Sequence, residues 1–161
     1  FYDELSAWEH LQFVAQTRRL AAWEDTAEGL LRRFGLWSQQ AALPLAFSRG
    51  MRYKLALCLA LLVTPRILLL DEPFGPIDPV SADRLWDDLC SYRDTGMGIL
   101  LSSHQLPPRA LPDRYLVMEE GAIIAQGDPG ALRRSLGVET FSLDTVLRAA
   151  LAEHGVDAVD A

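Results

Sequence analysis

The sequence predicts an α/β fold in which the first third of the chain is helical. Two short aliphatic runs, 67–70 and 99–101, each end on polar residues, and a helical stretch from about 78 to 94 separates them. Before residue 66, apolar side chains recur at the three- and four-residue spacing of helices. A strand, a helix and a second strand of this length form a βαβ unit, in which the two strands are parallel.

Each helix of the first third is expected to start after a residue whose side chain accepts a hydrogen bond from a free backbone amide. The expected starts are Ser6 for a helix to about residue 20, Asp25 or Thr26 for a helix to about Gly35, and Ser48 for a helix from Met51 to Val63. Glu9, three residues after Ser6, completes a capping box. Pro65 cannot continue the third helix and marks its end.

The remaining elements follow from local patterns in residues 66–161. Four purely aliphatic residues, 67–70, predict a strand buried on both faces, as in parallel sheets. Asp78-Pro79 predicts an N-cap with a first-turn proline, opening a helix to about Asp94. The expected elements after it are a strand at 99–101, a hairpin of 115–118 and 122–126, a short helix near 129–136, and a helix from Ser142 to about Glu153. The tail after Gly155 has little to hold it.

Composition and charge exclude several classes of protein. The chain has 15 basic and 22 acidic residues and a net charge of -7, which argues against nucleic acid as a partner. The two cysteines, Cys58 and Cys90, lie far apart and are interpreted as buried thiols in a reducing compartment. The longest apolar run, 55–63, is half the length that a bilayer requires. With no signal peptide pattern, a cytoplasmic location is expected.

Polar residues follow both aliphatic strands directly. Asp71 and Glu72 end the first strand, and Ser103 and His104 end the second. Since ligands bind at the carboxyl ends of parallel strands, these ionisable groups are expected to converge on one edge of the sheet. An aspartate there can orient Mg²⁺ on a nucleotide, and an adjacent glutamate can polarise a water molecule. The alternative is that Asp71-Glu72-Pro73 merely ends a strand on a polar turn.

Two further features have a functional and a purely structural interpretation. The helix that begins at Ser48-Arg49-Gly50 presents free amides and a positive dipole end that suit a phosphate, or Ser48 is an ordinary cap. The loop 74–78 follows the acids and either belongs to the site or is only a turn. His104 could contact a phosphate or position a water, although a single histidine at a strand end is more often structural.

In this order and spacing, the motifs resemble those of the ATP-binding cassette (ABC) ATPase family. Residues 47–89 resemble the family's signature motif, signature helix, Walker B strand and D-loop. They read "FSRGMRYKLALCLALLVTPRILLLDEPFGPIDPVSADRLWDDL". Residues 99–106, "ILLSSHQL", resemble the H-switch of the family. Residues 113–132, "DRYLVMEEGAIIAQGDPGAL", resemble the hairpin and helix that follow the H-switch. Residues 2–16, "YDELSAWEHLQFVAQ", resemble the start of the family's helical subdomain. The resemblance covers roughly residues 1–136.

The resemblance implies a partial P-loop NTPase core with parallel strands, plus an α-helical subdomain. The implied domains are 1–64 (helical subdomain with the signature helix), 65–136 (second part of the RecA-like ATPase core) and 137–161 (C-terminal helix and tail).

The resemblance also implies roles for individual residues, with ATP and Mg²⁺ as cofactors. Asp71 would serve Mg²⁺, Glu72 would be the catalytic base, and His104 would contact the γ-phosphate. Asp78 would belong to the D-loop, which crosses a dimer interface. The signature residues Ser48, Arg49 and Gly50 would lie at the γ-phosphate of an ATP held mainly by the opposite subunit.

Three features depart from the family's pattern. Arg49 stands where the signature usually has glycine, and Met51 where it usually has glutamine. Such a Ser-x-Gly-Met variant resembles the signatures of some haem and multidrug exporter ATPases. Pro107, Pro108 and Pro112 replace an acidic helix that usually follows the histidine, so an irregular segment is expected there. No Gly-x-x-x-x-Gly-Lys occurs in the sequence, whose one lysine, Lys54, lies in the signature helix.

Two explanations of the missing phosphate loop remain open. Because the sequence opens on Phe1, one expectation is that an upstream segment supplies the loop. The other is a non-hydrolysing remnant that acts as an interaction module. On either explanation, residues 1–161 alone are not expected to hydrolyse ATP.

The leading functional hypothesis is the ATPase subunit of an ABC transporter. It would form a head-to-tail dimer with a second ATPase subunit and lie on the inner face of the membrane through a transmembrane permease partner. Export is the preferred direction, because "YDELSAWEHL" and "SRGM" resemble exporter-type cassettes. The rival hypothesis is a soluble ABC ATPase of DNA repair or translation. The acidic balance and the lack of a coiled-coil insertion argue against this rival.

Overall fold

The computed structural model describes residues 1–107, 110, 112–139 and 142–153. The chain divides into two compact units, Phe1–His104 and Gln105–Ala161, which are considered separately below. The expected tail after Gly155 lies outside the described residues. The functional division at 64/65 and 136/137 stays a prediction.

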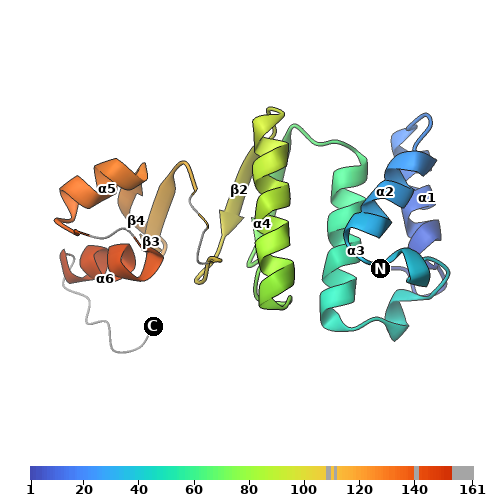
Figure 1. The fold of residues 1–161 in the computed structure, drawn as a ribbon, viewed down its shortest axis with the longest axis horizontal. Helices are drawn as coiled ribbons and strands as arrows, with labels where there is room; N and C mark the ends of the chain where they lie inside the picture. Colours follow the sequence, from blue (N-terminus) through green and yellow to red (C-terminus); the bar gives the residue numbers. More distant parts are fainter. Residues whose placement is uncertain (108–109, 111, 140–141, 154–161) are drawn as a thin grey trace. The chain divides into compact units, whose positions relative to one another are not determined.

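Three helices build the first part of unit 1 (Figure 1). They are α1 (Ala7–Arg18), α2 (Glu24–Arg33) and α3 (Arg49–Leu62), with the short 3-10 helices η1 (Trp37–Gln39) and η2 (Pro44–Ala46) before α3. Both α1 and α2 pack against α3. The buried side chains at their contacts are apolar and recur at helical spacing, among them Leu11, Ala15, Leu31, Leu55 and Cys58.

Local capping explains where two of these helices begin. The predicted capping box is confirmed: the Ser6 side chain accepts the N–H of Glu9, and the Glu9 carboxylate accepts the N–H of Ser6. The cap at Ser48 is confirmed as well. The predicted cap of α2 at Asp25 or Thr26 is wrong, because α2 begins at Glu24 after Trp23 without a side-chain cap.

The α/β part of unit 1 consists of β1 (Ile67–Asp71), α4 (Pro79–Asp94) and β2 (Gly98–Ser102). The two strands pair in parallel, as predicted, and α4 lies alongside β2 (Figure 1). Asp78 caps α4, and Pro79 occupies its first turn.

Burial of β1 on both faces is a wrong prediction for the described chain. Leu68 is buried at 4% exposure, but Ile67 and Leu69 on the opposite face are 68% and 69% exposed. Leu100 of β2 lies on an exposed face too. The physical reason is that, among the described residues, no element covers this second face of the two-stranded sheet.

Unit 2 contains the predicted hairpin of β3 (Tyr115–Glu119) and β4 (Ala122–Gly127), followed by α5 (Pro129–Ser135) and α6 (Leu143–Glu153). Its core consists of Tyr115, Val117, Leu132, Val146 and Ala150. The expected irregular segment after the histidine is confirmed for the described residues between His104 and Tyr115, which form no helix. Pro108 lies outside the described residues.

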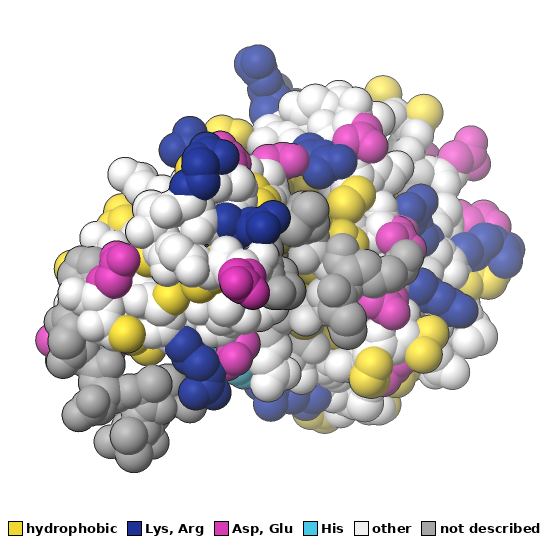
Figure 2. Space-filling model, turned by 60° about the vertical axis from the view of Figure 1, so that its left-hand side comes forward, with side chains coloured by type: hydrophobic (Ala, Val, Ile, Leu, Met, Phe, Trp, Pro, Cys, Tyr) yellow, Lys and Arg dark blue, Asp and Glu magenta, His cyan; other side chains and the backbone are white. Residues whose placement is uncertain are grey.

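The surface carries charged side chains of both signs, as the mixed acidic and basic composition of the sequence predicts (Figure 2). On the face drawn in Figure 2, acidic and basic side chains are interspersed. Within the described ranges, no helix has the length and hydropathy that crossing a membrane requires.

Candidate functional site at the ends of β1 and β2

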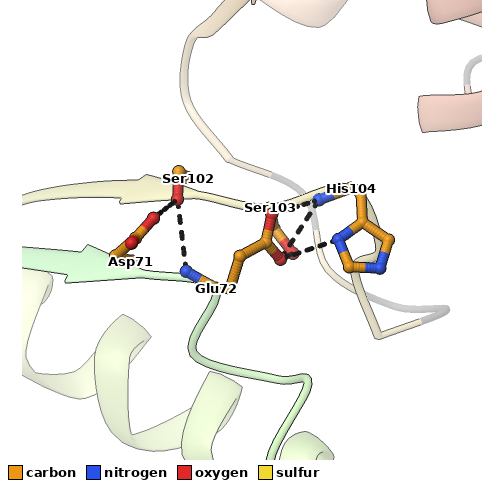
Figure 3. A network of polar contacts seen from close by, with 5 residues as sticks. All are labelled: Asp71, Glu72, Ser102, Ser103 and His104. Atoms are coloured by element: carbon orange, nitrogen blue, oxygen red, sulfur yellow. Dashed lines mark hydrogen bonds and ion pairs between the residues drawn. The ribbon is translucent and has the colours of Figure 1, made fainter.

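The parallel register places the polar ends of the two strands side by side. Asp71 is the partner of Ser102 across the sheet. The Ser102 hydroxyl donates to Oδ1 of Asp71 over 2.5 Å, which holds one oxygen of an exposed carboxylate (Figure 3). Among the residues that the structure describes, no hydrogen bond or ion pair engages the second carboxylate oxygen of Asp71.

Glu72 turns the chain out of the strand. Its φ of 45° lies in the left-handed region, which costs free energy for a residue with a Cβ atom. Its N–H donates to the carbonyl oxygen of Ser102 over 3.1 Å and lies 3.2 Å from the Ser102 hydroxyl oxygen. Ser102 therefore contacts both acids, through its backbone and its side chain.

The Glu72 carboxylate is paired with His104. Nδ1 of His104 lies 2.9 Å from Oε2 of Glu72, and the His104 N–H donates to Oε1 over 3.2 Å. The Ser103 hydroxyl approaches the same Oε2 at 3.4 Å (Figure 3). The side chains of Glu72 and His104 are 43% and 69% exposed, so a ligand or water from solvent can reach the pair. We call Asp71, Glu72, Ser102, Ser103 and His104 the strand-end network.

The residues Ser48, Arg49 and Gly50 lie at the N-terminus of α3. The Ser48 hydroxyl accepts the N–H of Met51 over 3.2 Å, and Arg49 is exposed. A Cβ atom added at Gly50 would lie 3.0 Å from the carbonyl oxygen of Pro76. Glycine allows this close approach between α3 and the loop that follows β1, whereas a Cβ atom would require the carbonyl of Pro76 to shift by a few tenths of an ångström.

Asp78 ends that loop and caps α4. Its Oδ1 accepts the N–H of Ser81 over 2.9 Å. Hydrogen bonding to the hydroxyl and the N–H of Ser81 lowers the pKa of the Asp78 carboxyl below its ordinary value of 3.8. The Asp78 carboxylate therefore has a structural role as a cap.

The structure thus groups the predicted site residues in two sets. Asp71, Glu72 and His104 meet in the strand-end network, as expected from the parallel strands. Ser48, Gly50 and Asp78 lie around the loop 73–78, and within the described residues no hydrogen bond joins them to the network.

Sequence reasoning missed Ser102. This serine joins the two acids, but a serine at a strand end is too common to stand out. The signal that could have revealed it is the pairing of the two strands, because once Leu70 lies opposite Leu101 the next residues, Asp71 and Ser102, lie opposite each other.

The strand-end network offers carboxylate oxygens, the ligand type that Mg²⁺ prefers. Among the described residues, no group of three or more His, Cys, Asp and Glu side chains could enclose a metal. Mg²⁺ is usually held by one or two carboxylates together with water and substrate phosphates, not by an all-protein cage. The exposed carboxylate of Asp71, with one oxygen oriented by Ser102, fits such a site.

Comparison with known proteins identifies the family of proteins that this chain resembles. The family model for the ABC transporter matches residues 1–75. YthP of Bacillus subtilis, an uncharacterized ABC transporter ATP-binding protein, is 36% identical over 89% of this chain and 62% of its own length. A solved structure of an ATP binding subunit of an ABC transporter matches 93% of this chain with a TM-score of 0.83 and 30% identity.

The chain belongs to the ABC transporter ATP-binding family. The P-loop NTPase fold is shared with a solved ATP-binding cassette in its ADP conformation, at a TM-score of 0.60 and 19% identity over 78% of this chain. The daunorubicin/doxorubicin resistance ATP-binding protein of Streptomyces peucetius is 36% identical over 74% of this chain. A probable multidrug ABC transporter ATP-binding protein of Escherichia coli is 33% identical over 87%.

The chain spans only part of its relatives. It covers 62% of YthP, 36% of the Streptomyces protein and 64% of the solved ATP binding subunit. The family binds ATP and consists generally of ATPases, and the part of the ABC fold described above includes the ends of two parallel core strands.

Proposed function

We propose that this protein hydrolyses ATP as a subunit of an ABC transporter, with the strand-end network as its hydrolytic half-site. The observation that supports this most strongly is the contact between Glu72 and His104 beside Asp71, at the carboxyl ends of two parallel strands. A base, a second polar group and a magnesium ligand then lie together at one edge of the sheet, joined by contacts across the two strand ends.

Glu72 is the proposed general base. An ionised carboxylate can accept a proton from a water molecule at Oε1 or Oε2, and both oxygens are fixed by contacts with His104. His104 has a second ring nitrogen, which takes no part in this pair and is proposed to contact the terminal phosphate. The exposure of both side chains lets water and nucleotide reach them.

Asp71 is the proposed magnesium residue. Mg²⁺, when bound with ATP, neutralises charge on the phosphates and orients them. The Ser102 hydroxyl holds Oδ1 of Asp71 in place and leaves Oδ2 to approach the ion or one of its waters.

Residues around the loop 73–78 are proposed to act across a dimer. Ser48, Arg49 and Gly50 would present the amide end of α3 to the γ-phosphate of an ATP held by the opposite subunit. Asp78 would lie at the same interface. The Gly50–Pro76 approach supports this proposal, because it makes the α3 terminus and the loop one continuous surface.

A phosphate-gripping loop must complete the site. No Gly-x-x-x-x-Gly-Lys occurs among the 161 residues, so we propose that hydrolysis needs a Lys-containing loop from outside them. Residues 1–161 alone are expected to show no magnesium-dependent ATPase activity.

Transport would require a transmembrane permease, with the protein peripheral on the cytoplasmic side of the membrane. Export is the proposed direction. Its support is that two relatives are named for drug resistance and multidrug transport. Co-purification with a polytopic membrane protein supports this assignment, whereas co-purification with ribosomes or DNA contradicts it.

The decisive experiment is an ATPase assay on the protein as it is synthesised in its own cell. Replacing the base, Glu72→Gln, should lower magnesium-dependent hydrolysis by about 10²–10⁴-fold while ATP binding persists. His104→Ala should lower hydrolysis as well. The matched control is Glu120→Gln, an exposed glutamate in the β3–β4 turn, which should leave hydrolysis unchanged. Wild-type activity in Glu72→Gln would contradict the proposal.

A further inference from the structure

A pocket of about 170 Å³ lies between α2, α3 and α4, away from the strand-end network. Four cationic side chains line it, and one acidic side chain, Asp88, lies among them. The cations are Arg32, Arg33, Lys54 and Arg84. This wall is positive in a chain whose net charge is -7. The local reversal of charge indicates a site for an anion.

Neighbouring acids neutralise two of the four cations. Arg33 forms an ion pair with Asp88, and Arg32 lies 2.7 Å from a carboxylate oxygen of Glu28. Within the described residues, neither Lys54 nor Arg84 forms an ion pair with a carboxylate. These two cations remain available to a ligand.

Lys54 is half-buried, and its ammonium is held beside a hydroxyl group. Nζ of Lys54 donates to Oγ of Ser81 over 3.0 Å. Asp78 is the carboxylate that interacts with Lys54 through space, but its Oδ1 already accepts the N–H of Ser81. The pocket therefore offers an ammonium, a hydroxyl and, one helical turn after Ser81, the guanidinium of Arg84.

We propose that this pocket binds a phosphate group, either inorganic phosphate or a phosphate monoester. The ammonium of Lys54, the hydroxyl of Ser81 and the guanidinium of Arg84 donate to its oxygens. A guanidinium and an ammonium are the side-chain groups that best recognise phosphate. The pocket volume of about 170 Å³ is well above the roughly 10–15 Å³ that one water molecule needs on the same measure, so a tetrahedral anion fits.

Such a ligand would join two helices that begin near the proposed dimer interface. Lys54 lies on α3, which begins after Ser48, whereas Ser81 and Arg84 lie in the first turns of α4, which Asp78 caps. An anion bound by all three side chains stabilises one relative placement of these helices. The proposed site is thus positioned to regulate the protein by the concentration of a phosphorylated compound.

The test is a titration of the protein with inorganic phosphate at constant ionic strength, with chloride as the exchanged anion. Amide NMR shifts of α4 residues near Ser81 and Arg84 should change and saturate in the millimolar range. The double variant Lys54→Gln/Arg84→Gln should weaken binding at least tenfold. The matched control is Arg148→Gln in α6, an exposed arginine outside the pocket, which should bind as the wild type does.

A second arm distinguishes the two sources of phosphate. Tighter binding of glycerol phosphate than of inorganic phosphate would identify a phosphate monoester as the ligand class, whereas equal or weaker binding would identify the free anion. If Lys54→Gln does not fold, Lys54→Arg should bind phosphate as well as the wild type, and Arg84→Gln alone should bind more weakly. No saturable shift up to tens of millimolar phosphate, or equal binding by Arg84→Gln and wild type, would overturn the proposal.

Discussion

His104 and Glu72 lie 32 residues apart in the sequence, yet Nδ1 of the imidazole is 2.9 Å from Oε2 of the carboxylate. The backbone N–H of His104 contacts the same carboxylate, so one residue binds it through both its main chain and its side chain. Ser102, two residues before His104, holds the neighbouring acid, Asp71. Each acid is therefore oriented by a residue from the end of β2.

Ser102→Ala tests how far the hydroxyl of Ser102 stabilises the ends of the strands. The substitution removes the hydroxyl that donates to Asp71 over 2.5 Å. We expect the free energy of unfolding to fall by about 1 kcal/mol, the net value of a typical hydrogen bond. Urea unfolding measures it as a lower midpoint. In the control Ser135→Ala, the lost hydroxyl only donates to a carbonyl of its own helix over 3.3 Å, and the midpoint should not move. Equal midpoints for Ser102→Ala and the wild type would contradict the expectation.

Gly50→Ala tests the approach of α3 to the loop after β1. The added Cβ would lie 3.0 Å from the carbonyl oxygen of Pro76, so the loop or the helix must shift. We expect a loss of about 1 kcal/mol in the free energy of unfolding, as for overpacking elsewhere. The matched control is Gly29→Ala in α2, where no described atom outside the surrounding helix backbone lies within 4 Å of the added Cβ. Because alanine favours a helix interior, this control should gain roughly 0.5–1 kcal/mol. A stabilised Gly50→Ala would show that the contact relaxes without cost.

Asp78→Asn tests a pH dependence of stability. Hydrogen bonds from Ser81 lower the pKa of Asp78 below its ordinary value of 3.8 in the folded protein. Stability from this group is therefore fully present above pH 3.8 and is lost as the pH falls through the lower, folded pKa. Asparagine can still cap α4 but does not titrate, so the variant should lose less stability on acidification.

Urea unfolding midpoints from about pH 5 down to about pH 3 measure this difference. Asp128, which caps α5, also has a lowered pKa, caused mainly by the backbone N–H of Ala131. Asp128→Asn should therefore show the same reduced loss, in unit 2. Parallel losses in wild type and both variants would rule out this origin of the acid sensitivity.

The two cysteines should differ in reactivity. Cys58 of α3 is 0% exposed, and burial raises the pKa of its thiol to about 12. Cys90 of α4 is half-buried. Because the thiolate is the reacting form, iodoacetamide should alkylate Cys90 first and Cys58 only when urea unfolds the protein. Peptide mass spectrometry over time measures both rates. Equal rates in the folded protein would show that α3 opens locally.

Local sequence determined where most elements of this protein begin. Ser6, Ser48 and Asp78 were predicted as caps and act as caps, because a cap depends on a side chain that reaches an amide three residues ahead. The start of α2 was missed since its first turn has no side-chain cap and Trp23, just before it, packs against Trp8. Packing between Trp8 and Trp23 depends on residues that are distant in the sequence, so a local capping pattern could not predict it.

The order of motifs in the sequence was enough to assign the chain to the ABC family. It was also enough to predict that Asp71, Glu72 and His104 lie at one edge of a sheet. Tertiary structure alone decided their partners: the register sets Ser102 against Asp71, and the left-handed turn at Glu72 directs its carboxylate to His104. It also decided that one face of β1 is exposed, against the prediction. Caps and strand ends depend on neighbours in the sequence, whereas register and burial depend on which distant segments pack against them.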